Sequence, residues 1–247
     1  MQKIGLFGSC QLHECHKFFL NKQVTRRKFK IVFSLRFYEY NPLFVKYKGD
    51  LNYALFDEID ILIIENNNLD NQASSKKIIE YCKDKPIRII KTFLIKFPIF
   101  PINWSGLGEK QRDYINWIDL DTINFQSKFD ACMASCVKHN RESDLSLTIS
   151  TFIKNRFNQQ LLFTHSLHPT NVLLYELWRC IFDKLFINID DYNYNFNCEL
   201  VENSWHNPFT QKMMVDLNIQ FNPPIDDTFY VDRYNKHKTE MLTLINK

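Results

Sequence analysis

The first residue suited to be a reaction centre is Cys10, in the stretch Gly8-Ser9-Cys10-Gln11. An apolar run at 4–7 precedes it and a helical pattern at 11–20 follows, so a strand turns into a helix here. The carboxyl end of a strand is where α/β folds bind ligands. Free N–H groups at a helix start favour an anion and lower the pKa of a thiol. We therefore predict Cys10 as the reactive centre; the alternative is a buried structural cysteine.

The second candidate is His168, in His168-Pro169-Thr170, directly before a strong helical pattern. Pro169 is tolerated in a first helical turn, and Thr170 or Asn171 can cap the helix. This would hold His168 on a rigid loop, as a general base requires. A thiol and a distant histidine that meet in space form a nucleophile–base pair. The alternative is a histidine that only satisfies backbone groups.

Asn66 is the third candidate, because Asn66-Asn67-Asn68 follows an apolar run at 60–64. In a parallel sheet these residues lie at the same edge as Cys10. An asparagine amide at that edge can donate to an oxyanion. A simple turn is the alternative. We predict no metal site, since Cys10 and its neighbours His13, Cys15 and His16 do not share one helix face.

Strands alternating with helices in the first hundred residues predict an α/β fold with a central, mostly parallel sheet flanked by helices, of the flavodoxin-like type. Helical patterns dominate the rest of the chain. We predict a single domain over 1–247, with a strand–helix core at 1–100 and a helix-rich part at 101–247 that completes the site. The expected strands are 4–7, 29–35, 60–64 and 86–93, and the expected helices are 11–20, 74–82, 143–157 and 172–186.

Composition excludes several classes of function. A net charge of +3 without a long basic run argues against nucleic acid as a partner. No segment is apolar enough for a membrane span or a secretory signal, so we expect a cytoplasmic protein. The frequent Asn, Ile and Lys suggest an AT-rich genome, and the host cytoplasm if that genome is viral. An oligomer is possible through aromatic side chains at Tyr192, Tyr194 and Phe196.

Two of these motifs together resemble the WcbI family of polysaccharide biosynthesis proteins. That family has Gly-Asn-Cys-Gln near its start and Asn-His-Pro-Thr later, where this chain has Gly8-Ser9-Cys10-Gln11 and Leu167-His168-Pro169-Thr170. Arg141-Glu142, followed by Asp144, also fits the layout of the family. Ser9 and Leu167 depart from the residues of the family.

The resemblance implies transfer of an acetyl group from acetyl-CoA to a sugar or nucleotide-sugar acceptor. It assigns Cys10, His168 and Asn66 to catalysis. Residues implied to contact coenzyme A are Gly8, Ser9, Gln11, Arg141, Pro169 and Thr170. Further cations for the phosphates of CoA are available at Arg26, Arg27, Lys28 and Lys138, and the aromatic segment 97–104 offers an apolar slot.

A more distant likeness is to the SGNH hydrolases, which share the fold class. Their nucleophile is third in a Gly-Asp-Ser motif, as Cys10 is third in Gly-Ser-Cys, and their histidine precedes a proline, as His168 does. This likeness implies an esterase or deacetylase as the alternative function. A non-catalytic glycan-assembly module is a further alternative, because Ser9 and Leu167 are altered.

Overall fold

The computed structural model describes residues 1–21, 27–42, 44, 46–100, 122–165, 167–187 and 209–222. Its centre is a parallel sheet of four strands in the order β2-β1-β3-β4. The chain moves outward from β1 to β2 and then returns to the other side of β1 for β3. The point where the strand order reverses therefore lies between β1 and β3, and open α/β sheets bind ligands there. The strands are β1 (Gln2–Gly8), β2 (Phe29–Arg36), β3 (Ile61–Asn66) and β4 (Arg88–Phe93).

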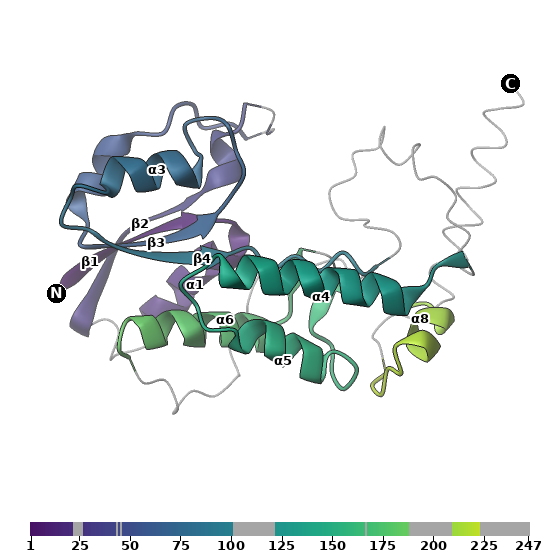
Figure 1. Ribbon diagram of the computed structural model, residues 1–247. Helices are drawn as coiled ribbons and strands as arrows, with labels where there is room; N and C mark the ends of the chain where they lie inside the picture. The colour runs from purple at the N-terminus through teal and green to yellow at the C-terminus, as the bar shows by residue number, and fades with distance from the viewer. Residues whose placement is uncertain are drawn as a thin grey trace, which may run out of the picture.

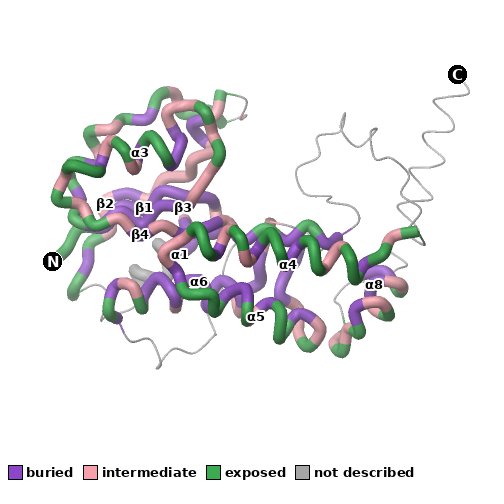
Figure 2. The backbone as a smooth tube through the Cα atoms, in the orientation of Figure 1, coloured by how far each residue is buried: buried purple, intermediate pink, exposed green. Residues whose placement is uncertain are grey.

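Both faces of the sheet are covered, which explains why its strands are almost continuously apolar. One face packs under α3 (Ser75–Cys82) and the other under α1 (Cys10–Asn21) and α6 (Asn171–Lys184) (Figure 1). Side chains alternate between the faces along β3: Ile61 and Ile63 join the core with α1 and α6, whereas Leu62 and Ile64 join the core with α3. The two inner strands, β1 and β3, and α6 are buried over most of their length (Figure 2).

The described residues after β4 are mainly helical, as predicted. It contains α4 (Phe125–Arg141), α5 (Thr148–Arg156), α6 and α8 (Gln211–Asp216). A short hairpin of β5 (Phe163–His165) and β6 (His168–Pro169) leads into α6. Short 3-10 helices lie at η1 (Phe37–Tyr40) and η2 (Tyr53–Glu58). The α/β class and the helix-rich second part are thus confirmed.

The helix expected from residue 143 begins five residues later, at Thr148. The carboxylate of Asp144 accepts a hydrogen bond from Lys91 N (2.6 Å) on β4, and its backbone N–H donates to Lys91 O (2.8 Å). The Asn140 amide donates to Ser146 O (3.0 Å). These bonds hold the connection in a non-helical path, which local periodicity does not reveal.

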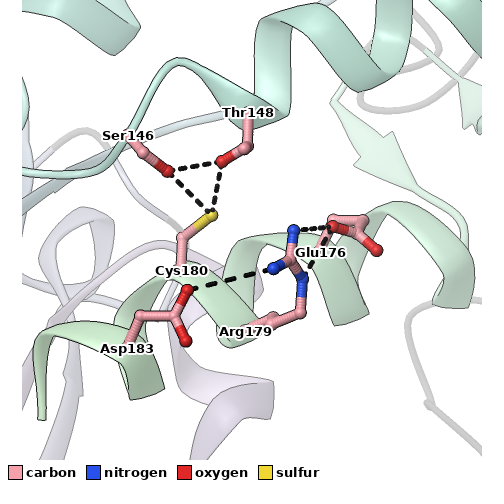
Figure 3. A network of polar contacts seen from close by, with 6 residues as sticks. All are labelled: Ser146, Thr148, Glu176, Arg179, Cys180 and Asp183. Carbon is pink, nitrogen blue, oxygen red and sulfur yellow. Dashed lines mark hydrogen bonds and ion pairs between the residues drawn. The ribbon is translucent and has the colours of Figure 1, made fainter. Parts of the chain in front are cut away.

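Helix α6 is fixed to the start of α5 by a part-buried polar contact. The thiol of Cys180, which is buried, lies 3.1 Å from Thr148 Oγ1 and 3.7 Å from Ser146 Oγ (Figure 3). On the neighbouring face of α6, Arg179 bonds Glu176 at 2.8 Å, an i,i+3 pair. A well-anchored α6 matters because the hairpin that carries His168 ends at its first turn. Among the described residues, no helix has the length and apolarity to cross a membrane.

Candidate active site

Cys10 is the first residue of α1, at the carboxyl end of β1. Ser9 caps this helix: its Oγ accepts a hydrogen bond from Gln11 N (3.2 Å), and its carbonyl accepts from His13 N (3.0 Å). Gly8 is required by close packing, because a Cβ there would lie 2.8 Å from Leu12. The predicted turn from strand to helix is confirmed, and Cys10 lies beside the point where the strand order reverses.

His168 approaches Cys10 from the other end of the chain. The Sγ of Cys10 lies 3.8 Å from Nε2 of His168, although 158 residues separate them. His168 is in β6, and its carbonyl accepts a hydrogen bond from Thr164 Oγ1 (3.1 Å). The structure therefore brings together the two residues from which the sequence predicts a nucleophile–base pair.

Gln11 connects the two halves of this pair. Its side chain is fully buried, and its Nε2 donates to Leu167 O (2.8 Å), next to His168, and to Ile95 O (2.9 Å). Its Oε1 accepts from Ile95 N (3.1 Å). The helix that begins at Cys10 is thus fastened to the hairpin of His168. A direct contact of Gln11 with coenzyme A stays a prediction, and both of its donor hydrogens are already used inside the protein.

Glu65 is the residue that the sequence analysis missed. It is the penultimate residue of β3, is 1% exposed, and its Oε2 accepts hydrogen bonds from Ser9 Oγ (2.8 Å) and Ser9 N (3.1 Å). It shares a sheet face with Ile61 and Ile63, the face on which α1 lies. The signal was present in the sequence as a single carboxylate that directly follows the apolar run Ile61–Ile64 of a strand buried on both faces.

Asn66 is the last residue of β3, but its amide points to another partner. Its Nδ2 donates to Glu142 O (3.2 Å), at the C-terminal end of α4. The alternation along β3 gives the inner position beside Ser9 to Glu65. Asn67 accepts hydrogen bonds from Leu69 N and Ser75 N, both at 3.2 Å, so this part of the segment is a turn. The oxyanion role of Asn66 stays a prediction.

The other expected contacts with coenzyme A lie on different elements. Arg141 is exposed at the end of α4 and lines a groove there together with Lys138 and Lys154. Pro169 is buried, and Thr170 Oγ1 donates to Leu161 O (3.0 Å) where α6 begins. Among the described residues, no hydrogen bond or ion pair links Arg141 or Thr170 to Cys10. The role of both residues in binding CoA stays a prediction.

Comparison with known proteins identifies a shared fold. No family model and no curated protein matches the chain. Among solved structures it is similar to WcbI, a polysaccharide biosynthesis enzyme, in its native form without a disulfide bond between CoA and a cysteine. The TM-score is 0.59 at 15% identity, covering 79% of this chain and 73% of WcbI. The chain has the fold of WcbI. The resemblance seen in the motifs is thereby confirmed for the fold, and the likeness to SGNH hydrolases stays a prediction.

The charges around Cys10 correct one expectation. Burial, and after it the Glu65 carboxylate, together raise the pKa of the Cys10 thiol to about 12. The backbone N–H groups at the helix start and the guanidinium of Arg36 lower it by less. The helix start thus lowers this pKa as expected, but the expected net lowering was wrong, because desolvation and a like charge outweigh the helix. Burial lowers the pKa of His168, so its imidazole is neutral at pH 7.

Arg36 and Tyr38 flank Cys10 on the side away from Glu65. Arg36 is the register partner of Gly8 at the end of β2, and its Nη1 donates to Tyr38 OH (3.3 Å). Ser34, two residues earlier, bonds His13 Nδ1 of α1 at 2.9 Å, so alternation puts Arg36 on the same face as α1. Arg36 also pairs with Glu39 at 3.2 Å. This cation was not among those expected from the sequence.

Three remaining expectations have distinct outcomes. No group of three or more metal-ligating side chains occurs among the described residues. The described part of the aromatic segment, 97–100, belongs to the core: Phe97 is fully buried and stacks on Phe163 at 4.9 Å, which corrects its assignment to a ligand slot. Arg27 and Lys28 are exposed. Arg26, residues 101–104 and the aromatic residues Tyr192, Tyr194 and Phe196 lie outside the described residues.

Proposed function

We propose that this chain is a CoA-dependent acyltransferase of glycan biosynthesis, which moves an acetyl group from acetyl-CoA to a sugar or nucleotide-sugar acceptor. The observation that carries the proposal is the contact of 3.8 Å between Cys10 Sγ and His168 Nε2 beside the reversal of strand order. The fold of WcbI, a polysaccharide biosynthesis enzyme described with CoA and a cysteine, supports the choice of donor and pathway.

The chemistry begins with a proton transfer. Neutral His168 takes the proton of the Cys10 thiol, and the thiolate attacks the thioester carbonyl of the substrate. The carbon–sulfur bond to CoA breaks, and His168 returns the proton to the departing CoA sulfur, which leaves an acetyl-cysteine. In the second half, His168 removes a proton from the acceptor hydroxyl or amine as that group attacks the acetyl carbonyl. Cys10 leaves and takes the proton back from His168.

A raised thiol pKa makes His168 essential to this scheme. With a pKa of about 12, Cys10 is almost entirely protonated at pH 7, so the thiolate arises only as the base removes the proton. A single-step variant uses the same residues: Cys10 borders the thiol of CoA, and His168 activates the acceptor for direct attack on acetyl-CoA. The presence or absence of an acetyl-cysteine separates the two routes.

Several side chains fit the remaining parts of the substrate. Arg36 offers a cation for an acidic group of the donor, because it lies on the Cys10 face and its side chain is 37% exposed. The N–H groups at the start of α1 near Gln11, together with Asn66, are proposed to bind the oxyanion, and Gly8 and Ser9 are proposed to border CoA. Arg141, Pro169 and Thr170 complete the proposed contacts with CoA. This arrangement needs no metal.

The test is native mass spectrometry of the purified protein with and without acetyl-CoA. We expect a CoA complex, and an acetyl adduct of Cys10 that is absent from Cys10→Ala and retained in Cys132→Ala, which removes a different buried cysteine. His168→Ala should slow acetyl transfer by roughly 10²–10⁴-fold. A CoA complex without an adduct would select direct transfer.

Failure to bind acetyl-CoA at millimolar concentration, or full activity of His168→Ala, would refute the proposed function. Release of acetate from acetyl-CoA without transfer to any sugar would indicate an esterase of the SGNH type instead.

A further inference from the structure

The buried carboxyl of Glu65 has one bonded oxygen and one unbonded oxygen. Oε2 accepts both hydrogen bonds from Ser9, whereas Oε1 is buried and has no hydrogen-bond partner among the described residues. A buried carboxylate oxygen without a donor is strongly disfavoured, but a protonated one carries no charge. Burial accordingly raises the pKa of Glu65 to about 7, against the opposing effect of the Ser9 bonds.

Thr92 on β4 is the neighbour of the Glu65 carboxyl across the sheet. It is the register partner of Glu65, so the two side chains lie next to each other on the same face of the sheet. Thr92 is 1% exposed, and its Oγ1 also lacks a partner among the described residues. Within the described part of the chain, no hydrogen-bonded donor reaches Oε1 and no cation acts on Glu65 to stabilise a charge there.

Cys10 is close enough for its ionisation to be affected by Glu65. Ser9, which bonds Glu65, directly precedes Cys10, and an ionised Glu65 raises the pKa of the thiol. The other groups facing Cys10 are Arg36 and Tyr38, at the end of β2, and His168 in β6. Arg36 favours the thiolate but is already paired with Glu39, and His168 is neutral. The site thus has little positive charge to balance two anions.

We propose that Glu65 is a positioning residue of this site, which fixes the turn of Cys10 through Ser9 and which must be neutral for the Cys10 thiolate to form. The two acids form a coupled pair that carries one negative charge at a time. This inference rests on the reactive role of Cys10 in the proposed function. It adds that the thiol reacts with the proton still on Glu65, and that an ionised Glu65 holds Cys10 in its unreactive thiol form.

The test is the rate at which iodoacetamide alkylates Cys10, followed from pH 5.5 to 9 by mass spectrometry of the peptide that contains it. In this reaction the thiolate displaces iodide and forms a carbon–sulfur bond. Glu65→Gln keeps the size of the side chain and an acceptor for Ser9, but has no charge. At pH 8.5 we expect this variant to react about tenfold faster than the natural protein. A tenfold increase corresponds to a thiol pKa that is lower by about one unit. At pH 5.5 the two rates should agree.

The control is Glu80→Gln, which removes an exposed carboxylate from α3 on the opposite face of the sheet and should leave the profile unchanged. A purely structural role of Glu65 would change the rate equally at all pH values. A second variant, Ser9→Ala, deletes a hydrogen bond that lowers the pKa of Glu65. Ionisation of Glu65 should flatten the rise of the alkylation rate with pH near pH 7, and Ser9→Ala should move this flattening to higher pH. This variant also keeps the test valid if Glu65→Gln does not fold.

Equal rates for Glu65→Gln and the natural protein at pH 8.5, or an unmoved profile in Ser9→Ala, would overturn the inference. The experiment contains no CoA, so a negative result here is separate from a failure to bind or use acetyl-CoA.

Discussion

The charge of Glu65 should make the stability of the whole protein depend on pH in an unusual direction. Its pKa is about 7 in the folded protein, against an ordinary value of 4.5. Because the folded carboxyl keeps its proton to higher pH than the unfolded one, folding is favoured by this group at low pH. The stability is lost as pH rises from 4.5 through 7. The difference between the two pKa values corresponds to about 3 kcal/mol in the free energy of unfolding.

Glu65→Gln isolates this contribution, because glutamine does not titrate. The variant can gain or lose stability through its new amide, but that effect is the same at every pH. We therefore expect the free energy of unfolding of the variant, relative to the natural protein, to rise by about 3 kcal/mol between pH 4.5 and pH 8. Urea denaturation followed by circular dichroism at four pH values measures it, with Glu80→Gln as the control. A difference that stays constant within about 0.5 kcal/mol would refute the reasoning.

Three further substitutions test the local packing by the same urea assay. Gly8→Ala places a Cβ 2.8 Å from Leu12 and 3.0 Å from Glu65 Cβ and should destabilise by about 1–3 kcal/mol; an unchanged midpoint would contradict the packing. Gln11→Ala removes three hydrogen bonds, two of them buried, and should cost about 2–4 kcal/mol while slowing any reaction of Cys10 with its substrate; unaltered kinetics would mean that Gln11 does not position the site. Thr92→Val should be neutral or stabilising by up to about 1 kcal/mol, and a loss of stability would reveal a partner for the hydroxyl.

The sequence predicts the framework of this protein well because its strands are buried on both faces. Runs such as Ile61–Ile64 consist of apolar residues, most of them β-branched. In the helices between such runs, apolar residues recur at helical spacing. The turn at Cys10 was readable because a glycine and a polar cap residue occur together at the end of such a run. These local signals explain why the fold could be predicted from the sequence.

The charge state of the site could not be predicted in the same way. Helix starts lower thiol pKa values when they are solvated, whereas Cys10 is desolvated and lies near Glu65, two facts that depend on tertiary packing. Glu65 and Asn66 are neighbours in sequence, and only the alternation of the folded strand shows which of them faces Ser9. Arg36 was missed for a similar reason, since its nearness to Cys10 requires the pairing of β1 with β2.

The separation of Cys10 and His168 along the chain has a consequence for protein synthesis. Ribosomes add about 5–20 residues per second, so a gap of 158 residues delays the histidine by roughly 8–30 s after the cysteine. During this interval the nascent chain contains the thiol but not its base, nor the Leu167 carbonyl that Gln11 anchors. The emerging chain therefore cannot react prematurely through this pair. Base-assisted reaction at Cys10 therefore begins only when the last part of the site docks, whereas the solvated thiol of the emerging chain keeps its ordinary pKa of 9.0.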